Sequence, residues 1–223
     1  VLLQASAGTL TLSGNAGLSF SAGDGTADST MTFSGAKADL NNALDGLVYE
    51  PTANTSGNIT LTITTTETGG GTQSDTDTIT ISLSAVNDAP TITLPATQEA
   101  IQNSDFEFSV ARGNAITIVD DASDDPGEAP NGAWMEVEIT VTKGIVTLKD
   151  ISGLVSATGA NASASMSYWG PVNAYNTAFE GMTFSPENDY QGAAQIQFRI
   201  NDQGGYGSGG AKEITESLDI SVV

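Results

Sequence analysis

Asn58-Ile59-Thr60-Leu61-Thr62-Ile63-Thr64 is a stretch in which apolar and polar residues alternate strictly. Because successive side chains of a β-strand point to opposite faces of a sheet, Ile59, Leu61 and Ile63 share one face. This pattern is typical of a strand with one face against a core and the other in water. The same period occurs at 78–83, 137–141, 196–200 and 218–222. We therefore expect antiparallel sheets packed as β-sandwiches.

Two parts of the chain are versions of one unit, which indicates a tandem repeat. Matching stretches are 8–12 with 144–148, 44–51 with 179–186, and 54–57 with 189–192. Val1 aligns with Val137, so the opening segment of the second copy, Thr91 to Glu136, has no counterpart in the first. A repeat whose copies share no catalytic group points to architecture or adhesion.

The expected fold class is all-β, with two tandem antiparallel sandwiches of the immunoglobulin-like kind. We expect an incomplete repeat at 1–87, lacking its N-terminal strands, and a complete repeat at 88–223 with an acidic loop insertion. One short segment, 36–44, has helical spacing of its apolar residues, and its match in the second copy is 171–179. We expect each segment to form a helix of one to two turns.

The net charge of −21, with only six Lys and Arg, determines which partners are compatible with the chain. A phosphate backbone would be repelled, so we expect no nucleic-acid partner. Self-repulsion among the carboxylates destabilises the folded chain unless cations neutralise it, which makes Ca²⁺ an attractive cofactor. The alternative is that the acidic residues only make the protein soluble.

The sequence contains neither Cys nor His. Disulfides, thiolate metal sites, imidazole bases and the usual nucleophile–base pairs are therefore excluded, and we expect no enzyme activity. No apolar run approaches the ~18 residues that a membrane-spanning helix needs. The first residues also lack the features of a signal peptide, so an export signal would lie outside this sequence.

Val86-Asn87-Asp88-Ala89-Pro90 separates the two copies. With this junction and stretches such as Gly46-Leu47-Val48-Tyr49-Glu50-Pro51, the chain resembles the cadherin-like repeats of bacterial RTX-type surface adhesins and chondroitin-sulfate-proteoglycan-type repeats. The resemblance implies a secreted or cell-surface array of β-sandwiches associated with calcium. Such arrays are usually spacers or adhesive modules.

In cadherin-like repeats, the resemblance also implies a calcium site at the domain junction. The matching positions here are Asn87, Asp88, Glu99, Asp120, Asp121 and Asp202. Calcium prefers six to eight oxygen ligands, which acidic loops can supply. A cluster of this kind is also expected by composition alone in so acidic a chain.

A sandwich without its opening strands exposes a hydrophobic groove and an unpaired strand edge. Two explanations stay open: the natural protein is longer, or another molecule supplies the strands. The expected partners are neighbouring repeats of the same chain or identical subunits. The second explanation makes the protein a self-assembling fibre or surface-layer subunit.

Aromatic residues of the second copy suggest a carbohydrate-binding module as a third hypothesis. Tyr168 and Trp169 are the predicted ligand-binding residues, because aromatic rings can stack on sugars. Their alternative role is packing in the core or at a sheet edge.

Overall fold

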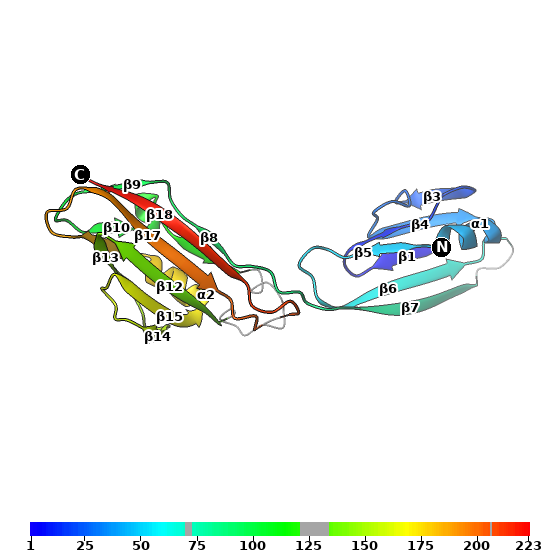
Figure 1. The fold of residues 1–223 in the computed structure, drawn as a ribbon. Coiled ribbons are helices and arrows are strands. Elements are labelled where there is room, and N and C mark those ends of the chain that lie inside the picture. The colour runs from blue at the N-terminus through cyan, green and yellow to red at the C-terminus, as the bar shows by residue number, and fades with distance from the viewer. Residues whose placement is uncertain (70–72, 121–133, 206) are drawn as a thin grey trace. The chain divides into compact units, whose positions relative to one another are not determined.

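A computed structural model describes residues 1–69, 73–120, 134–205 and 207–223. The chain divides into two compact units, Val1–Ala85 and Val86–Val223 (Figure 1). Val86 and Asn87 therefore belong to the second unit, whereas the sequence placed them at the end of the first. Among the described residues, neither α-helix is long or apolar enough to cross a bilayer.

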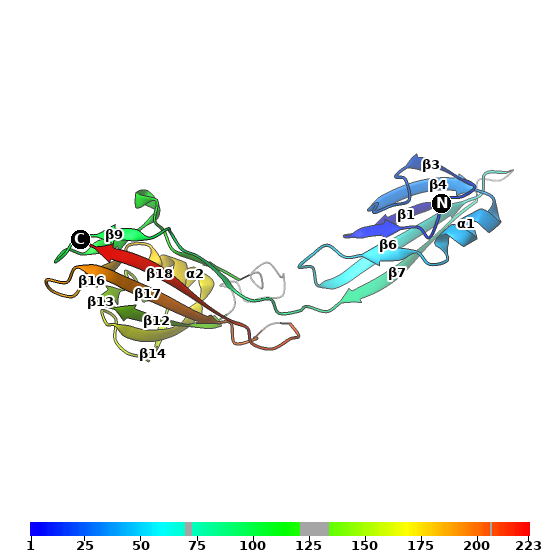
Figure 2. The ribbon, with the colours of Figure 1, turned by 45° about the horizontal axis from the view of Figure 1, so that its top comes forward.

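The first unit is built around a five-stranded antiparallel sheet in the order β3-β4-β1-β6-β7. Its strands are β1 (Leu2–Ala5), β3 (Leu18–Ala22), β4 (Thr30–Gly35), β6 (Gly57–Thr66) and β7 (Ser74–Leu83). A separate pair is formed by β2 (Thr9–Thr11) and β5 (Val48–Glu50). The helix α1 (Lys37–Leu44) follows β4 at one end of the sheet (Figures 1 and 2).

The core of the first unit contains the apolar face that alternation predicts. Ile59 and Leu61 of β6 are buried, and Ile63 is half-buried. All three residues pair with β7 on one side, and Leu61 and Ile63 also pair with β1 on the other. The buried apolar side chains clustered with Leu61 and Ile63 include Leu3, Leu10, Met31 and Phe33.

The second unit contains a six-stranded sheet in the order β14-β15-β12-β17-β18-β9. Its strands are β9 (Gln98–Ala100), β12 (Trp134–Thr142), β14 (Val155–Thr158), β15 (Ser165–Pro171), β17 (Gly192–Asn201) and β18 (Glu213–Val222). The other strands are β8 (Thr91–Thr93), β10 (Phe106–Phe108), β11 (Thr117–Val119), β13 (Gly144–Thr147) and β16 (Met182–Pro186). They form the sheets β10-β16-β13 and β11-β8. A 3-10 turn, η1 (Val110–Arg112), follows β10.

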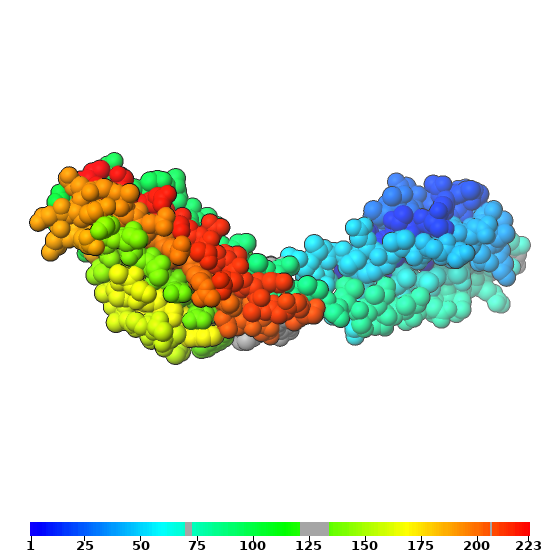
Figure 3. Space-filling model, in the orientation of Figure 1, coloured from blue at the N-terminus to red at the C-terminus, as the bar shows by residue number. Residues whose placement is uncertain are grey.

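The helix α2 (Val172–Phe179) lies on one face of the six-stranded sheet (Figure 2). Its Phe179 ring contacts Phe198 of β17 edge to face, with centroids 5.7 Å apart. Tyr175 and Phe179 are each only 1% exposed, so this helix completes the core. β17 and β18 lie side by side and form an outer surface of the unit (Figure 3).

The two large sheets share one strand order, with β3-β4-β1-β6-β7 corresponding to β14-β15-β12-β17-β18. Among the described residues of the first unit, no strands correspond to β8 through β11. The all-β sandwich class and both short helices are thus confirmed. The strand β9 pairs with β18 in parallel and covers its edge, whereas β7 lies at the edge of its sheet.

Candidate functional site

Asn87 and Asp202, both predicted metal ligands, meet in the second unit and are 5% and 2% exposed. The side-chain amide of Asn87 donates to Asp202 Oδ2 at 2.8 Å and to the carbonyl oxygen of Gly210 at 2.9 Å. The backbone N–H of Asn87 donates to the carbonyl oxygen of Ser208 at 2.8 Å. These bonds tie the segment before β8 to the loop between β17 and β18.

The second oxygen of Asp202 holds the same loop closed. Asp202 Oδ1 accepts the backbone N–H groups of Gly204 at 2.8 Å and Lys212 at 2.7 Å. Such charge-assisted bonds offset the cost of burying a carboxylate. Gly204 has φ +61°, and a Cβ there would lie 2.4 Å from the Ala211 nitrogen, so the turn requires glycine. We call Asn87, Asp202 and these bonded backbone groups the Asn87–Asp202 cluster.

Two further predicted ligands, Asp88 and Asp120, belong to the same end of the unit. Asp120 follows Val119, which pairs with Thr91 at the start of β8, so it lies at the end of this ladder that Asn87 approaches. Asp120 is buried, at 1% exposed, and Asp88 is exposed. Asp121 and most of the predicted acidic insertion lie outside the described residues.

Glu99 lies at the opposite end of the sheet, so the prediction that it joins this site is wrong. It is exposed on β9 and pairs with Ser221 of β18, whereas Asn201, next to Asp202, pairs with Glu213. Eight residues of strand separate Ser221 from Glu213, which corresponds to about 26 Å at ~3.3 Å per residue. The parallel pairing of β9 with the far end of β18 causes this separation.

The residues that are described do not form a calcium site on their own. Among them, no group of three or more His, Cys, Asp or Glu side chains is placed to hold a metal ion. The side-chain NH₂ group of Asn87 donates to two acceptors, Asp202 Oδ2 and the Gly210 carbonyl oxygen. These two bonds orient the amide with its NH₂ group toward Asp202. The Asn87–Asp202 cluster therefore closes a loop through N–H donors.

The two residues of the predicted sugar platform lie on opposite faces of β15. Tyr168 is 2% exposed and its carbonyl oxygen accepts the hydroxyl of Tyr175, so its ring belongs to the core and cannot contact a sugar. Trp169 is half-buried on the outer face of the sheet. Consecutive residues of a strand face opposite sides, so alternation alone excludes a shared platform for Tyr168 and Trp169.

Trp134 is the exposed aromatic residue that the sequence analysis did not select, at 53% exposed. Trp134 pairs with Pro171 and Glu136 pairs with Trp169, so the two indoles are diagonal neighbours on one face. The signal was present in the alternation of 134–142, where Met135, Val137 and Ile139 are the buried positions.

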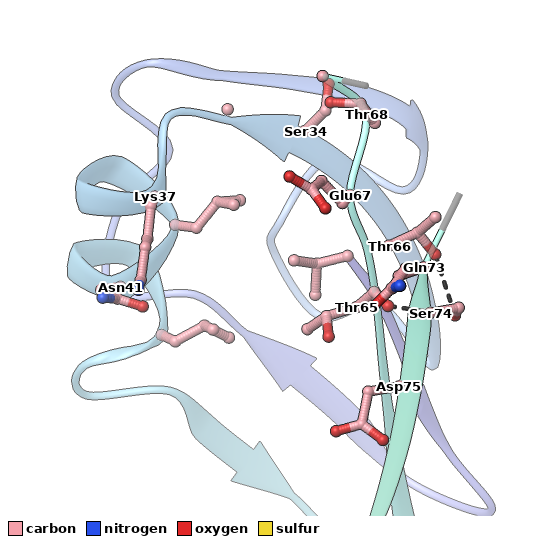
Figure 4. A pocket seen from close by; sticks show the side chains of 15 residues that line it. Ser34, Lys37, Asn41, Thr65, Thr66, Glu67, Thr68, Gln73, Ser74 and Asp75 are labelled. Atoms are coloured by element: carbon pink, nitrogen blue, oxygen red, sulfur yellow. Dashed lines mark hydrogen bonds between the residues drawn. The ribbon is translucent and has the colours of Figure 1, made fainter. Parts of the chain in front are cut away.

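A groove of about 640 Å³ lies in the first unit between α1 and the ends of β6 and β7 (Figure 4). Its apolar lining includes Val1, Leu40 and Leu44. Lys37 and Asn41 line it on the helix side, and Thr65, Ser74 and Asp75 line it on the strand side (Figure 4). The spacing of Leu40 and Leu44 predicts one apolar face on α1. The structure adds that both side chains are only half-buried and line this groove.

No protein-family model and no curated protein matches the chain. Among solved structures, it is similar to one titled protocadherin gammaB7 EC3-6 cis-dimer, with 16% identity and a TM-score of 0.38, over 99% of this chain. The chain spans 41% of that protocadherin chain. A second match is titled as manganese lipoxygenase of Gaeumannomyces graminis with a partial structure of zonadhesin of Komagataella pastoris. Its TM-score is 0.30, with 10% identity over 99% of this chain and 81% of that chain. Both TM-scores are too low to carry an argument, so the sandwich assignment depends on the strand pairing described above.

Proposed function

We propose that the chain is a structural or adhesive repeat segment of an extracellular protein, secreted or held at the cell surface. The observation that supports this most is the Asn87–Asp202 cluster. Only residues 84–86 separate the end of β7 from Asn87, whose backbone and side chain are already bonded into the second unit. Buried polar groups at the start of the second unit thus hold the segment before β8 against the loop between β17 and β18.

The proposal assigns no reaction to the chain. The sequence offers no His or Cys, and the buried carboxylate of Asp202 accepts three N–H donors. Such bonds stabilise a carboxylate in place, whereas a general acid or base exchanges protons with a substrate. Partners in this proposal are other repeats of the parent protein or identical subunits.

Calcium stays a prediction within this proposal. The described residues do not complete a site, and the acidic stretch after Asp120 would have to supply further oxygens. The burial of Asp120 at the same end as Asn87 supports that position. A bound cation there would offset part of the net charge of −21.

Thermal unfolding in CaCl₂, MgCl₂ and NaCl at matched ionic strength tests the calcium prediction. We expect calcium to raise the Tm of the second unit beyond the other salts, and chelator to reverse the effect. Asp120→Asn should remove the calcium increment, whereas Glu216→Gln, which removes one exposed carboxylate of the same unit, should keep it. Equal effects of the three salts would exclude a specific site and leave the structural role intact.

A glycan-binding role is the second candidate, because Trp134 and Trp169 share one outer face. A sugar can stack only on an aromatic ring that is exposed, and Trp134 provides such a ring. We expect binding on a glycan array to be lost in Trp134→Ala and reduced in Trp169→Ala. Binding that survives both substitutions would exclude this surface.

A further inference from the structure

The second unit shows how its helix holds a strand. The backbone N–H of Ile118 in β11 donates to Asn176 Oδ1 at 2.8 Å, and Asn176 Nδ2 donates back to the Ile118 carbonyl oxygen at 2.9 Å. One side chain of α2 thus satisfies both backbone groups of one residue, as a neighbouring strand would. Ile118 is fully buried at 0% exposed.

The first unit has the same side chain at the corresponding helical position. Both helices span eight residues, and aligning Lys37–Leu44 with Val172–Phe179 places Asn41 at the position of Asn176. Asn41 is exposed and lines the groove between α1 and the ends of β6 and β7 (Figure 4). The groove is therefore bordered by the same residue type that binds a strand in the second unit.

Apolar side chains of α1 and β7 are less covered than the residues at matching positions of the second unit. Leu40 and Leu44 correspond to Tyr175 and Phe179, which are each 1% exposed, yet both leucines are only half-buried. On β7 the difference is larger. Leu83 pairs with Gly57 as Val222 pairs with Gly192, so four residues earlier Ile79 corresponds to Leu218. Ile79 is 49% exposed and Leu218 is 2% exposed.

Two strand edges of the first unit are also free at positions that residues 91–119 cover in the second. The strand β9 pairs with residues 220–222 of β18, and β10 pairs with β16. In the first unit, β7 corresponds to β18 and β5 corresponds to β16. Among the described residues, both β7 and β5 lie at the edges of their sheets. An edge presents unpaired N–H and C=O groups, which a further strand can bind.

We propose that the groove beside α1 is a strand-acceptor site for a separate polypeptide whose chemistry is that of residues 106–119. The backbone of the bound strand forms hydrogen bonds with the side chain of Asn41. Its alternate apolar side chains pack between α1 and the ends of β6 and β7 that line the groove. Ile116 and Ile118, at 2% and 0% exposed, show the side chains that such a strand contributes in the second unit. This is β-strand addition directed by a helix amide.

Charge further limits the partner. Residues 1–85 contain eight Asp and Glu but a single basic residue, Lys37, which lines the groove. A strongly acidic segment would be repelled, so the bound strand is neutral or basic, or at most weakly acidic. This proposal depends on neither calcium nor glycan binding, and its failure would leave both of those proposals standing.

The test uses the full chain and a fluorescent synthetic peptide of residues 105–119, in about 0.15 M NaCl so that long-range repulsion is screened. We expect saturable binding by fluorescence anisotropy. Hydrogen–deuterium exchange should show new protection in Lys37–Leu44 and Ser74–Leu83. No saturable binding, or protection confined to residues 86–223, would overturn the proposal.

Asn41→Ala and Asn42→Ala form a matched pair, since Asn42 lies on the same helix and does not line the groove. We expect Asn41→Ala to weaken binding by about tenfold, which corresponds to ~1.4 kcal/mol, while Asn42→Ala leaves it unchanged. Asn41 is exposed, and circular dichroism checks that the variant stays folded. Equal losses in both variants would contradict the assigned role of Asn41.

The peptide and its attachment supply two more controls. A peptide with Ile116→Ser and Ile118→Ser should not bind, because it keeps the backbone but loses the apolar side chains. Equal binding of this peptide would contradict a packed strand. Protection that appears only when the segment is fused ahead of Val1 would overturn the separate partner and assign the groove to a covalently attached strand.

Discussion

Asn87 stabilises the second unit by keeping a buried carboxylate satisfied. Its amide is one of the donors to Asp202 and also binds the Gly210 carbonyl. The sequence singled out both Asn87 and Asp202, but through a resemblance that implies a metal. It could not show the NH₂ group facing the carboxylate, because that depends on the loop between β17 and β18.

Asn87→Ala should lower the free energy of unfolding of the second unit by about 1–3 kcal/mol, because Asp202 loses a buried donor. Asn173→Ala is the control, since Asn173 is exposed on α2. Urea unfolding followed by tryptophan fluorescence measures this unit alone, because Trp134 and Trp169 are the two tryptophans of the chain. A loss as small as that of the control would contradict the structural role of the cluster.

Tyr175 makes the second unit sensitive to alkali. Burial raises the pKa of its hydroxyl well above the usual value of 10.0, and the nearby charge of Glu136 raises it further, against a lowering by the Val137 N–H. In the unfolded chain the group ionises near pH ~10. The stability contributed by the neutral hydroxyl is therefore complete below about pH 10 and is lost as the pH rises above it.

Tyr175→Phe should destabilise the second unit by about 1–3 kcal/mol at pH 7, because the Val137 N–H loses its buried acceptor. Between pH 9 and pH 11 the variant should lose less stability than the wild type. Urea midpoints by tryptophan fluorescence at each pH measure both effects, and Tyr49→Phe in the first unit is the control. Parallel losses in variant and wild type would contradict the account.

At the level of elements, corresponding strands of the two units differ in what covers them. Ile79 on β7 and Leu218 on β18 occupy matching register positions but are 49% and 2% exposed. Leu218→Ala should therefore cost about 2–5 kcal/mol, whereas Ile79→Ala should cost about 1 kcal/mol or less. Urea unfolding by far-ultraviolet circular dichroism reports both units, and tryptophan fluorescence separates the second. Equal losses at the two positions would show that β7 is covered like β18.

Alternation along 58–64 was enough to predict β6 and its buried face, because a strand pattern depends only on neighbouring residues. The helical spacing of apolar residues predicted the helix at 36–44, and alignment of the two copies predicted its counterpart at 171–179. Glu99 was misplaced because β9 pairs in parallel with the far end of β18, a contact between segments more than a hundred residues apart. The error of placing Tyr168 beside Trp169 in one platform could have been avoided from the sequence, because consecutive residues of a strand face opposite sides.

At the level of the whole molecule, the two sandwiches share one strand order, and among the described residues β18 has a strand along its edge whereas β7 does not. Backbone amides of an uncovered edge exchange with solvent faster than those in a paired ladder. Residues 91–119 supply that cover in the second unit, through β9 on β18 and through Ile118 on α2.

Native-state hydrogen exchange of the unliganded full chain, resolved to single amides, tests this claim most directly. The comparison is between residues 79–83 of β7 and residues 218–222 of β18, which occupy matching positions beside β6 and β17. We expect the outward-facing amides of β7 to exchange at least about tenfold faster than their counterparts next to β9, which bind a neighbouring strand. Equal protection in the two strands would contradict the account.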